Sequence, residues 1–194
     1  MTTIYFVRHA EPVHSDPDDR NRPLTAQGMK DTAFVLETLR DKKIDVFYCS
    51  PYKRSLQTIQ STADYFGMPI HTDERLRERQ AGNAGNIKNL FAKRWEDHNF
   101  HEPGGESIGM VRARNVAALM DILEENEGKT VVIGTHGTAL SSIINYFHPS
   151  FGCQDFLRII DWMPYILEMR FDGKELISMT EIAHLVKPFK PDNK

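Results

Sequence analysis

Cysteine is scarce in this sequence. Only Cys49 and Cys153 occur among 194 residues, too few and too far apart for a disulfide framework. No apolar run approaches the roughly 20 residues that a membrane-spanning helix requires, and the first residues lack the basic segment and apolar stretch of a secretory signal. These absences favour a protein of the reducing cytoplasm.

An excess of charge is also absent. The 24 lysines and arginines nearly balance the 27 aspartates and glutamates, and the formal net charge is −3. Nucleic acids and anionic membranes attract strongly basic surfaces, so neither is expected as a partner. Any anionic ligand must therefore be recognised by a local cluster of cations.

Neither repeats nor low-complexity linkers divide the chain. Hydrophobic residues make up 40% of it, and a chain of this length can bury a sizeable core. We therefore expect one soluble domain over residues 1–194.

Segments rich in β-branched and aromatic residues predict β-strands at residues 3–8, 44–49, 129–135, 165–171 and 175–182. Helical patterns lie between them, at residues 25–41, 50–66 and 107–128. This alternation predicts an α/β fold, a three-layer sandwich in which helices cover both faces of a mostly parallel sheet. The last two strands, turned by Asp172-Gly173, predict a hairpin that forms an antiparallel edge.

Residues with capping preferences mark the ends of the predicted helices. Thr25 is predicted to cap the first helix, and Ser50 to cap the second with Pro51 at its first position. The third pattern stops at Gly128. Residues 187–194 contain two prolines and show no pattern, so we expect this segment to be loose.

Cationic and imidazole side chains follow three of the predicted strands. The first strand ends at Arg8 and His9, the second leads into a helix whose first turn carries Arg54, and a later one ends at His136-Gly137. Each residue alone would be interpreted as an ordinary core or surface side chain. Because ligands bind beyond the carboxyl ends of parallel strands, and guanidinium groups match phosphate oxygens, their joint placement predicts a phosphate site.

Five motifs follow one another along the chain: VRHAEP, CSPYKRSLQT, LRER, PGGES and GTHG. In order and approximate spacing they resemble the histidine phosphatase superfamily, which includes the cofactor-dependent phosphoglycerate mutases and many small phosphatases. The resemblance implies that His9 is the nucleophile that becomes phosphohistidine, that Glu78 is the acid, and that the phosphoryl oxygens are held by Arg8, Arg54 and His136. It also implies phosphate- or substrate-binding roles for Ser15, Gly137 and Glu106.

The implied roles suit phosphoryl transfer. A nucleophilic imidazole must be neutral at its attacking nitrogen, which a hydrogen bond from the other N–H to a backbone carbonyl secures. Fixed arginines neutralise the transferring group, so neither a metal ion nor a cofactor is implied. Glu78 would protonate the leaving alkoxide; without the resemblance it would be interpreted as a solvated charge.

The sequence also departs from the family's common pattern. Ala10 stands where glycine is common, and Ser15 stands where an asparagine contacts phosphate. After the acid Gly82 is kept, but residues 84–86 replace a common Trp-Glu-Gly. The segment between Glu78 and PGGES is shorter than the insertion with which the glycolytic mutases enclose their substrate, which favours a phosphatase over a mutase.

Other kinds of site fit the sequence less well. Cysteine-dependent phosphatases have five residues between the cysteine and the arginine of their motif. In this sequence only four residues separate Cys49 from Arg54, and four separate Cys153 from Arg158. Both cysteines are therefore expected to lie in the core. His98 and His101 lack nearby residues that would complete a zinc site.

Three functions remain open. The leading one is a metal-independent phosphomonoesterase that acts through phosphohistidine on a small phosphorylated metabolite or a phosphoprotein. The second is a phosphoglycerate mutase-like phosphotransferase. The third is a catalytically weak protein that binds phosphorylated ligands, which the changed loop and Ser15 allow. The sequence is compatible with a homodimer.

Overall fold

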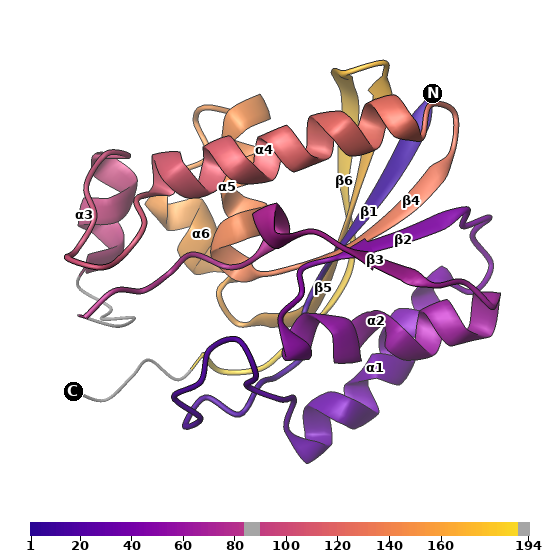
Figure 1. Cartoon of the computed structure of the whole chain (residues 1–194), viewed down its shortest axis with the longest axis horizontal. Helices are drawn as coiled ribbons and strands as arrows, with labels where there is room; N and C mark the ends of the chain where they lie inside the picture. The colour runs from indigo at the N-terminus through magenta and orange to yellow at the C-terminus, as the bar shows by residue number, and fades with distance from the viewer. Residues whose placement is uncertain (84–89, 190–194) are drawn as a thin grey trace.

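The structure, a computed structural model, describes residues 1–83 and 90–189. Within these residues one sheet contains six strands (Figure 1), namely β1 (Thr2–Arg8), β2 (Val46–Cys49), β3 (Ile70–Thr72), β4 (Thr130–Thr135), β5 (Trp162–Asp172) and β6 (Glu175–Val186). Their order across the sheet is β3-β2-β4-β1-β5-β6. The first four run parallel, whereas β5 and β6 form an antiparallel edge. The predicted fold class is confirmed.

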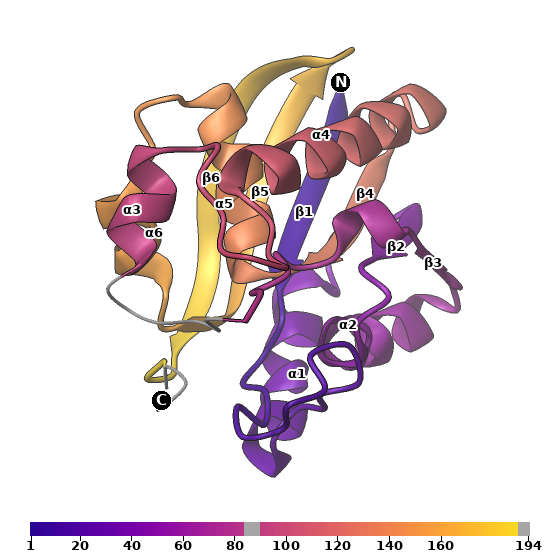
Figure 2. The same cartoon turned by 60° about the vertical axis from the view of Figure 1, so that its left-hand side comes forward.

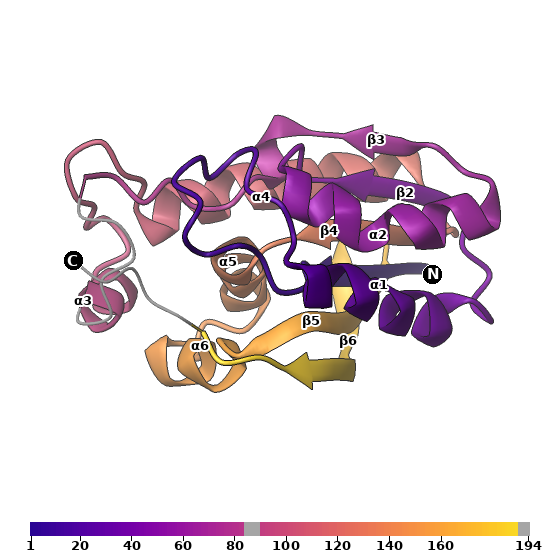
Figure 3. The ribbon, with the colours of Figure 1, turned by 90° about the horizontal axis from the view of Figure 1, so that it is seen from below.

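The helices of the described residues are α1 (Ala26–Leu39), α2 (Lys53–Phe66), the 3-10 turn η1 (Glu74–Leu76), α3 (Leu90–Glu96), α4 (Ile108–Glu125), α5 (Gly137–Phe147) and α6 (Cys153–Ile159). Figures 2 and 3 show α1 and α2 on one face of the sheet and α4 and α5 on the other. Among the described helices, none combines the length and apolar character needed to cross a membrane.

Two hydrophobic cores explain why helices cover both faces. Successive residues of a strand point to opposite faces, and in β1 Ile4 and Phe6 join one core while Tyr5 and Val7 join the other. The first core is completed by α4 and α5, and the second by α1 and α2. Burial on both faces is what makes β1 an almost continuous apolar run.

The register of the parallel strands aligns their carboxyl ends. In the β1–β4 pair Arg8 lies opposite Thr135, and in the β2–β4 pair Cys49 lies opposite Gly134. Because β4 lies between β1 and β2, the residues that follow all three strands emerge at one edge of the sheet. This edge carries the candidate active site.

The predicted start of the second helix is wrong. Thr25 does cap α1, since its side chain accepts a hydrogen bond from the N–H of Gly28 at 2.9 Å. In contrast, α2 begins at Lys53, and Tyr52 occupies its N-cap position. Ser50 contacts His136 instead, as described below.

Other boundaries differ in smaller ways. The strand β3 was not predicted, because three residues carry too little pattern. The hairpin turns at Gly173-Lys174, since Asp172 already pairs with Glu175. The predicted change of shape in the loop after Glu78 falls on residues 84–89, which lie outside the described part of the chain.

The expectation of a loose C-terminal segment is wrong for residues 187–189. The backbone N–H groups of Lys187 and Phe189 both donate to Asp161, and the Lys187 ammonium lies 3.0 Å from the Asp31 carboxylate. These contacts join residues far apart in the sequence, which local patterns do not reveal. Residues 190–194 lie outside the described part.

Candidate active site

The strands β1, β2 and β4 end at the same edge of the sheet (Figures 1 and 2), and the residues predicted to bind phosphate follow these ends along the chain. His9 follows β1, His136 lies between β4 and α5, and Arg54 lies in the first turn of α2. The rings of His9 and His136 are 5.3 Å apart between centroids. The ring of Tyr52 lies 5.3 Å from that of His136 and 5.1 Å from the Arg54 guanidinium.

His9 has the geometry of a nucleophile. Its Nδ1 lies 2.8 Å from the carbonyl oxygen of Ala10, and a carbonyl only accepts, so Nδ1 carries the proton. The lone pair then lies on Nε2. The backbone therefore fixes the tautomer that can attack phosphorus.

His136 has the same tautomer as His9, but a different partner sets it. Its Nε2 lies 2.7 Å from the hydroxyl oxygen of Ser50, and that oxygen also accepts the Tyr52 N–H at 3.2 Å. We assign the Ser50 hydroxyl as the donor to Nε2, which places the imidazole proton on Nδ1. Nδ1 is buried without a hydrogen-bond partner, so His136 can donate to a phosphoryl oxygen.

Burial holds the pKa of both imidazoles well below the usual value, and the positive charges of Arg54 and Arg8 lower the pKa further. His9 and His136 are therefore neutral near pH 7. This is the state that nucleophilic attack by His9 requires.

Acid pH is expected to destabilise the fold through His9 and His136. In the unfolded chain histidine protonates near pH 6.5, whereas both folded-state pKa values lie well below this. The unfolded state therefore binds more protons as pH falls through that value. The free energy of unfolding should drop by up to about 1.4 kcal/mol per pH unit for each imidazole, until pH reaches the folded-state pKa.

Urea denaturation between pH 7 and pH 5 measures this slope. In the variant His136→Gln, the dependence of the unfolding free energy on pH should be smaller by the contribution of one imidazole. His71→Gln, which changes an exposed histidine of β3, should retain the wild-type slope. Equal slopes in wild type and His136→Gln would contradict the assignment.

Arg8 is held by the backbone at the C-terminal end of α6. Its Nη1 donates to the carbonyl of Ile159 at 2.6 Å and its Nη2 to that of Ile160 at 2.9 Å. Nε is buried without a partner. A Cβ at Gly137 would lie 3.2 Å from Arg8 Cζ, so glycine leaves room for this guanidinium at the start of α5.

Arg54 is held by the loop between β1 and α1. Its Nη1 donates to the backbone carbonyl of Asp19, and its Nη2 lies 3.1 Å from the Asp19 carboxylate. The guanidinium is buried, and burial beside one carboxylate fixes its direction. Ser15 is exposed at a turn in the same loop, and its contact with phosphate stays a prediction.

Glu78 caps the N-terminus of α5. Its Oε1 accepts the N–H groups of Arg79 at 2.7 Å and Ala139 at 3.0 Å, and its Oε2 accepts that of Thr138 at 3.0 Å. Both lone pairs of Oε1 are thus occupied, whereas Oε2 retains one. A proton to be donated therefore belongs on Oε2.

Glu106 is held by two arginines and by the backbone N–H of Gln80. Its carboxylate lies 2.8 Å from the guanidinium of Arg114 and 2.9 Å from that of Arg77. Arg114 in turn donates to the backbone carbonyl of Glu78 at 2.9 Å. These contacts position Glu78, and direct substrate binding by Glu106 stays a prediction.

Three residues that support the site were not predicted from the sequence to belong to it. Ser50 orients His136, Asp19 holds Arg54, and Arg114 holds the backbone of Glu78. The position of Ser50 directly after β2 could have indicated a role in the site, but the sequence analysis interpreted this residue as a helix cap. The other two become partners only through the fold.

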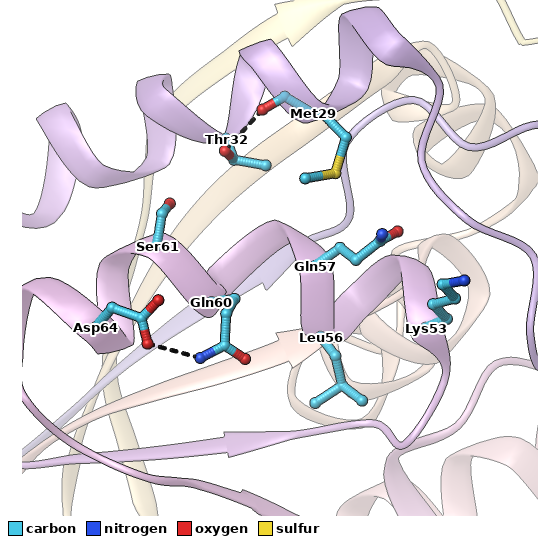
Figure 4. A pocket seen from close by; sticks show the side chains of 8 residues that line it. All are labelled: Met29, Thr32, Lys53, Leu56, Gln57, Gln60, Ser61 and Asp64. Carbon is cyan, nitrogen blue, oxygen red and sulfur yellow. Dashed lines mark hydrogen bonds between the residues drawn. The ribbon is translucent and has the colours of Figure 1, made fainter.

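No group of three or more His, Cys, Asp or Glu side chains is placed to hold a metal ion among residues 1–83 and 90–189. A groove of about 310 Å³ lies between α1 and α2 and is lined by residues including Met29, Gln57 and Asp64 (Figure 4). It contains none of the predicted site residues and is not a candidate for the phosphate site.

Known proteins are similar to this chain in sequence and in fold. A family model described as the histidine phosphatase superfamily (branch 1) matches residues 4–162. A protein of Yersinia enterocolitica named probable phosphoglycerate mutase GpmB is 29% identical over 159 residues, which covers 75% of this chain and 74% of that protein.

Solved structures are also similar. Bacillus stearothermophilus YhfR is 25% identical and superposes over 91% of this chain and 95% of its own, with a TM-score of 0.74. A phosphoserine phosphatase of Entamoeba histolytica, in complex with 3-phosphoglyceric acid, is 23% identical and covers 93% of this chain and 98% of its own, with a TM-score of 0.75. At that identity the second likeness concerns the fold alone.

Proposed function

Because the chain belongs to the histidine phosphatase superfamily, we propose that it is a metal-independent phosphomonoesterase that acts through a phosphohistidine at His9. One observation carries this proposal. The neutral imidazole of His9 presents the Nε2 lone pair beside three buried donor groups, those of Arg8, Arg54 and His136. The substrate class is a small phosphate ester or a phosphoprotein.

In the first step the Nε2 lone pair of His9 attacks phosphorus. The P–N bond forms as the bond from phosphorus to the ester oxygen breaks, and the proton on Glu78 Oε2 passes to the departing alkoxide. The carbonyl of Ala10, which accepts the Nδ1–H, stabilises the positive charge that develops on the ring.

In the second step water attacks the phosphohistidine. The ionised Glu78 takes the proton of this water, the P–N bond breaks, and inorganic phosphate leaves with His9 restored. In both steps Arg8 Nε, Arg54 and His136 Nδ1–H neutralise charge on the equatorial oxygens. Side chains of the protein thus stabilise the negative charge of the phosphoryl group during its transfer.

A mutase is the second candidate, since a relative is named a probable phosphoglycerate mutase. A mutase must protect its phosphoenzyme from water until the phosphoryl group returns to the substrate. The described cover beyond Glu78 is the seven-residue helix α3, which packs on α6 through Phe91, Trp95 and Phe156. This thin cover favours hydrolysis.

The test follows both isomers of phosphoglycerate and free phosphate. Enzyme with 3-phosphoglycerate and a trace of 2,3-bisphosphoglycerate should give inorganic phosphate or no product, whereas p-nitrophenyl phosphate should be hydrolysed with a chelator present. Interconversion of isomers faster than phosphate release would support the mutase. Binding of phosphate without turnover of any ester would support a phospho-ligand binding protein.

A further inference from the structure

The C-terminal segment 187–189 is attached to the turn between α6 and β5. The Lys187 N–H donates to the carbonyl oxygen of Asp161 at 2.7 Å, and the Phe189 N–H donates to its carboxylate at 2.6 Å. The Lys187 ammonium lies 3.0 Å from the Asp31 carboxylate of α1. The segment therefore ties this turn to a helix on one face of the sheet.

The same turn supports Arg8. The carbonyls of Ile159 and Ile160 accept both terminal nitrogens of its guanidinium, and the negative charge of the adjacent Asp161 attracts it. A guanidinium held by two carbonyls is only as fixed as those carbonyls. Any contact that immobilises residues 159–161 therefore also fixes Arg8.

The ring of Phe189 contacts both the loop that follows β1 and the helix α3. It lies 5.7 Å from the ring of His14 and 6.2 Å from that of Phe91, measured between centroids. His14 lies close enough to His9 for its charge to affect that imidazole. In Figure 1 the end of β6 runs on toward the loop that contains His14. Phe189 thus packs between this loop and the helices α3 and α6.

We propose that Lys187 and Phe189 are positioning residues of the active site, which hold Arg8 through the turn 159–161 and support the His9 loop through His14. The inference rests on the proposed function only in that Arg8 is taken to bind the phosphoryl group. This proposal gives a role to a segment that the sequence predicts to be loose.

Phe189→Ala should lower kcat/KM by roughly 10- to 100-fold, because small displacements of a positioned group cost factors of this size. Of a bound ester, Arg8 is taken to contact the phosphoryl group and not the alcohol, so the loss should be the same for p-nitrophenyl phosphate and for an alkyl phosphate. Inhibition by orthovanadate should weaken in parallel. Phe189→Leu, which retains an apolar side chain, should restore most of the activity.

Lys187→Met should act in the same direction, since it removes the ion pair with Asp31. Its matched control is Lys174→Met, which breaks the pair of Lys174 with Glu124 at 2.7 Å, at the far end of the β5–β6 hairpin. The control should retain wild-type kinetics. All assays are made well below each variant's melting temperature and normalised to folded protein.

A double-mutant cycle separates positioning from general stabilisation. In an Arg8→Ala background, Phe189→Ala should cost clearly less activity than in the wild type, because Arg8 is gone and only the support of the His9 loop is left to lose. Fully additive losses would overturn the proposal. So would a loss confined to esters with bulky alcohol groups, which would make Phe189 a wall of the substrate pocket.

Calorimetric titration with inorganic phosphate keeps this inference separate from the proposed function. If the wild-type protein hydrolysed no ester, the phosphomonoesterase proposal would fail, yet Phe189→Ala should still weaken phosphate binding. Unchanged phosphate affinity in Phe189→Ala would overturn the positioning role, whatever the enzyme does with esters.

Discussion

His9→Ala is expected to abolish turnover, lowering kcat by roughly 10⁴-fold or more, the scale on which the loss of a covalent nucleophile acts. No other described side chain offers an unprotonated nitrogen that a backbone carbonyl orients toward the three buried donors. The residual activity should come from direct attack of water on an ester that the remaining phosphate-binding groups hold.

A trapping experiment measures the same step directly. Wild-type protein quenched during turnover should carry a phosphoryl group on His9, in a bond that acid cleaves and alkali preserves, as for other phosphoramidates. The label should be missing from His9→Ala and retained in His71→Ala, which changes an exposed histidine of β3. Wild-type activity in His9→Ala would refute the mechanism.

Arg54→Ala should lower kcat/KM by roughly 100-fold or more for every ester, the effect of removing one preorganised donor from a transition state. Asp19 and burial already fix the direction of this guanidinium, so no reorganisation offsets its contribution. The assay compares p-nitrophenyl phosphate with an alkyl phosphate. Arg40→Ala, at the exposed end of α1, serves as the arginine control.

Glu78→Gln should separate the acid from the phosphate-binding groups. An activated leaving group needs little protonation, so p-nitrophenyl phosphate should be spared while the alkyl phosphate is hydrolysed much more slowly. The same change weakens the cap of α5, so rates are normalised to folded protein. Equal losses on both esters, as expected for Arg54→Ala, would show that Glu78 is not the acid.

The parts of the fold that local patterns determine were predictable from the sequence. The apolar run of β1, the cap at Thr25 and the hairpin at Gly173 each depend on residues near one another in the chain. The convergence of Arg8, His9 and His136 followed from a general property of parallel sheets. The prediction assumed that these strand ends are neighbours, and the order β2-β4-β1 in the sheet shows that they are.

The remaining parts depend on contacts between distant residues. The helix α5 was not predicted, because residues 139–145 are buried all round and an amphipathic period is lost. Ser50 has good capping chemistry, but His136 lies within hydrogen-bond distance and occupies its hydroxyl. Residues 187–189 are held by Asp161 and Asp31, partners that a linear pattern cannot identify.

The position of β4 between β1 and β2 also sets the order of events during synthesis. When residues 1–125 have left the ribosome, His9 and Arg54 are already present. The strands that precede them, β1 and β2, pair with β4 and not with each other. The guanidinium of Arg8 is fixed later still, once the carbonyls of residues 159 and 160 are present to accept its hydrogen bonds. Such long-range pairing makes folding slow relative to a helical bundle. The nascent protein therefore completes its phosphate site only after residue 160 has left the ribosome.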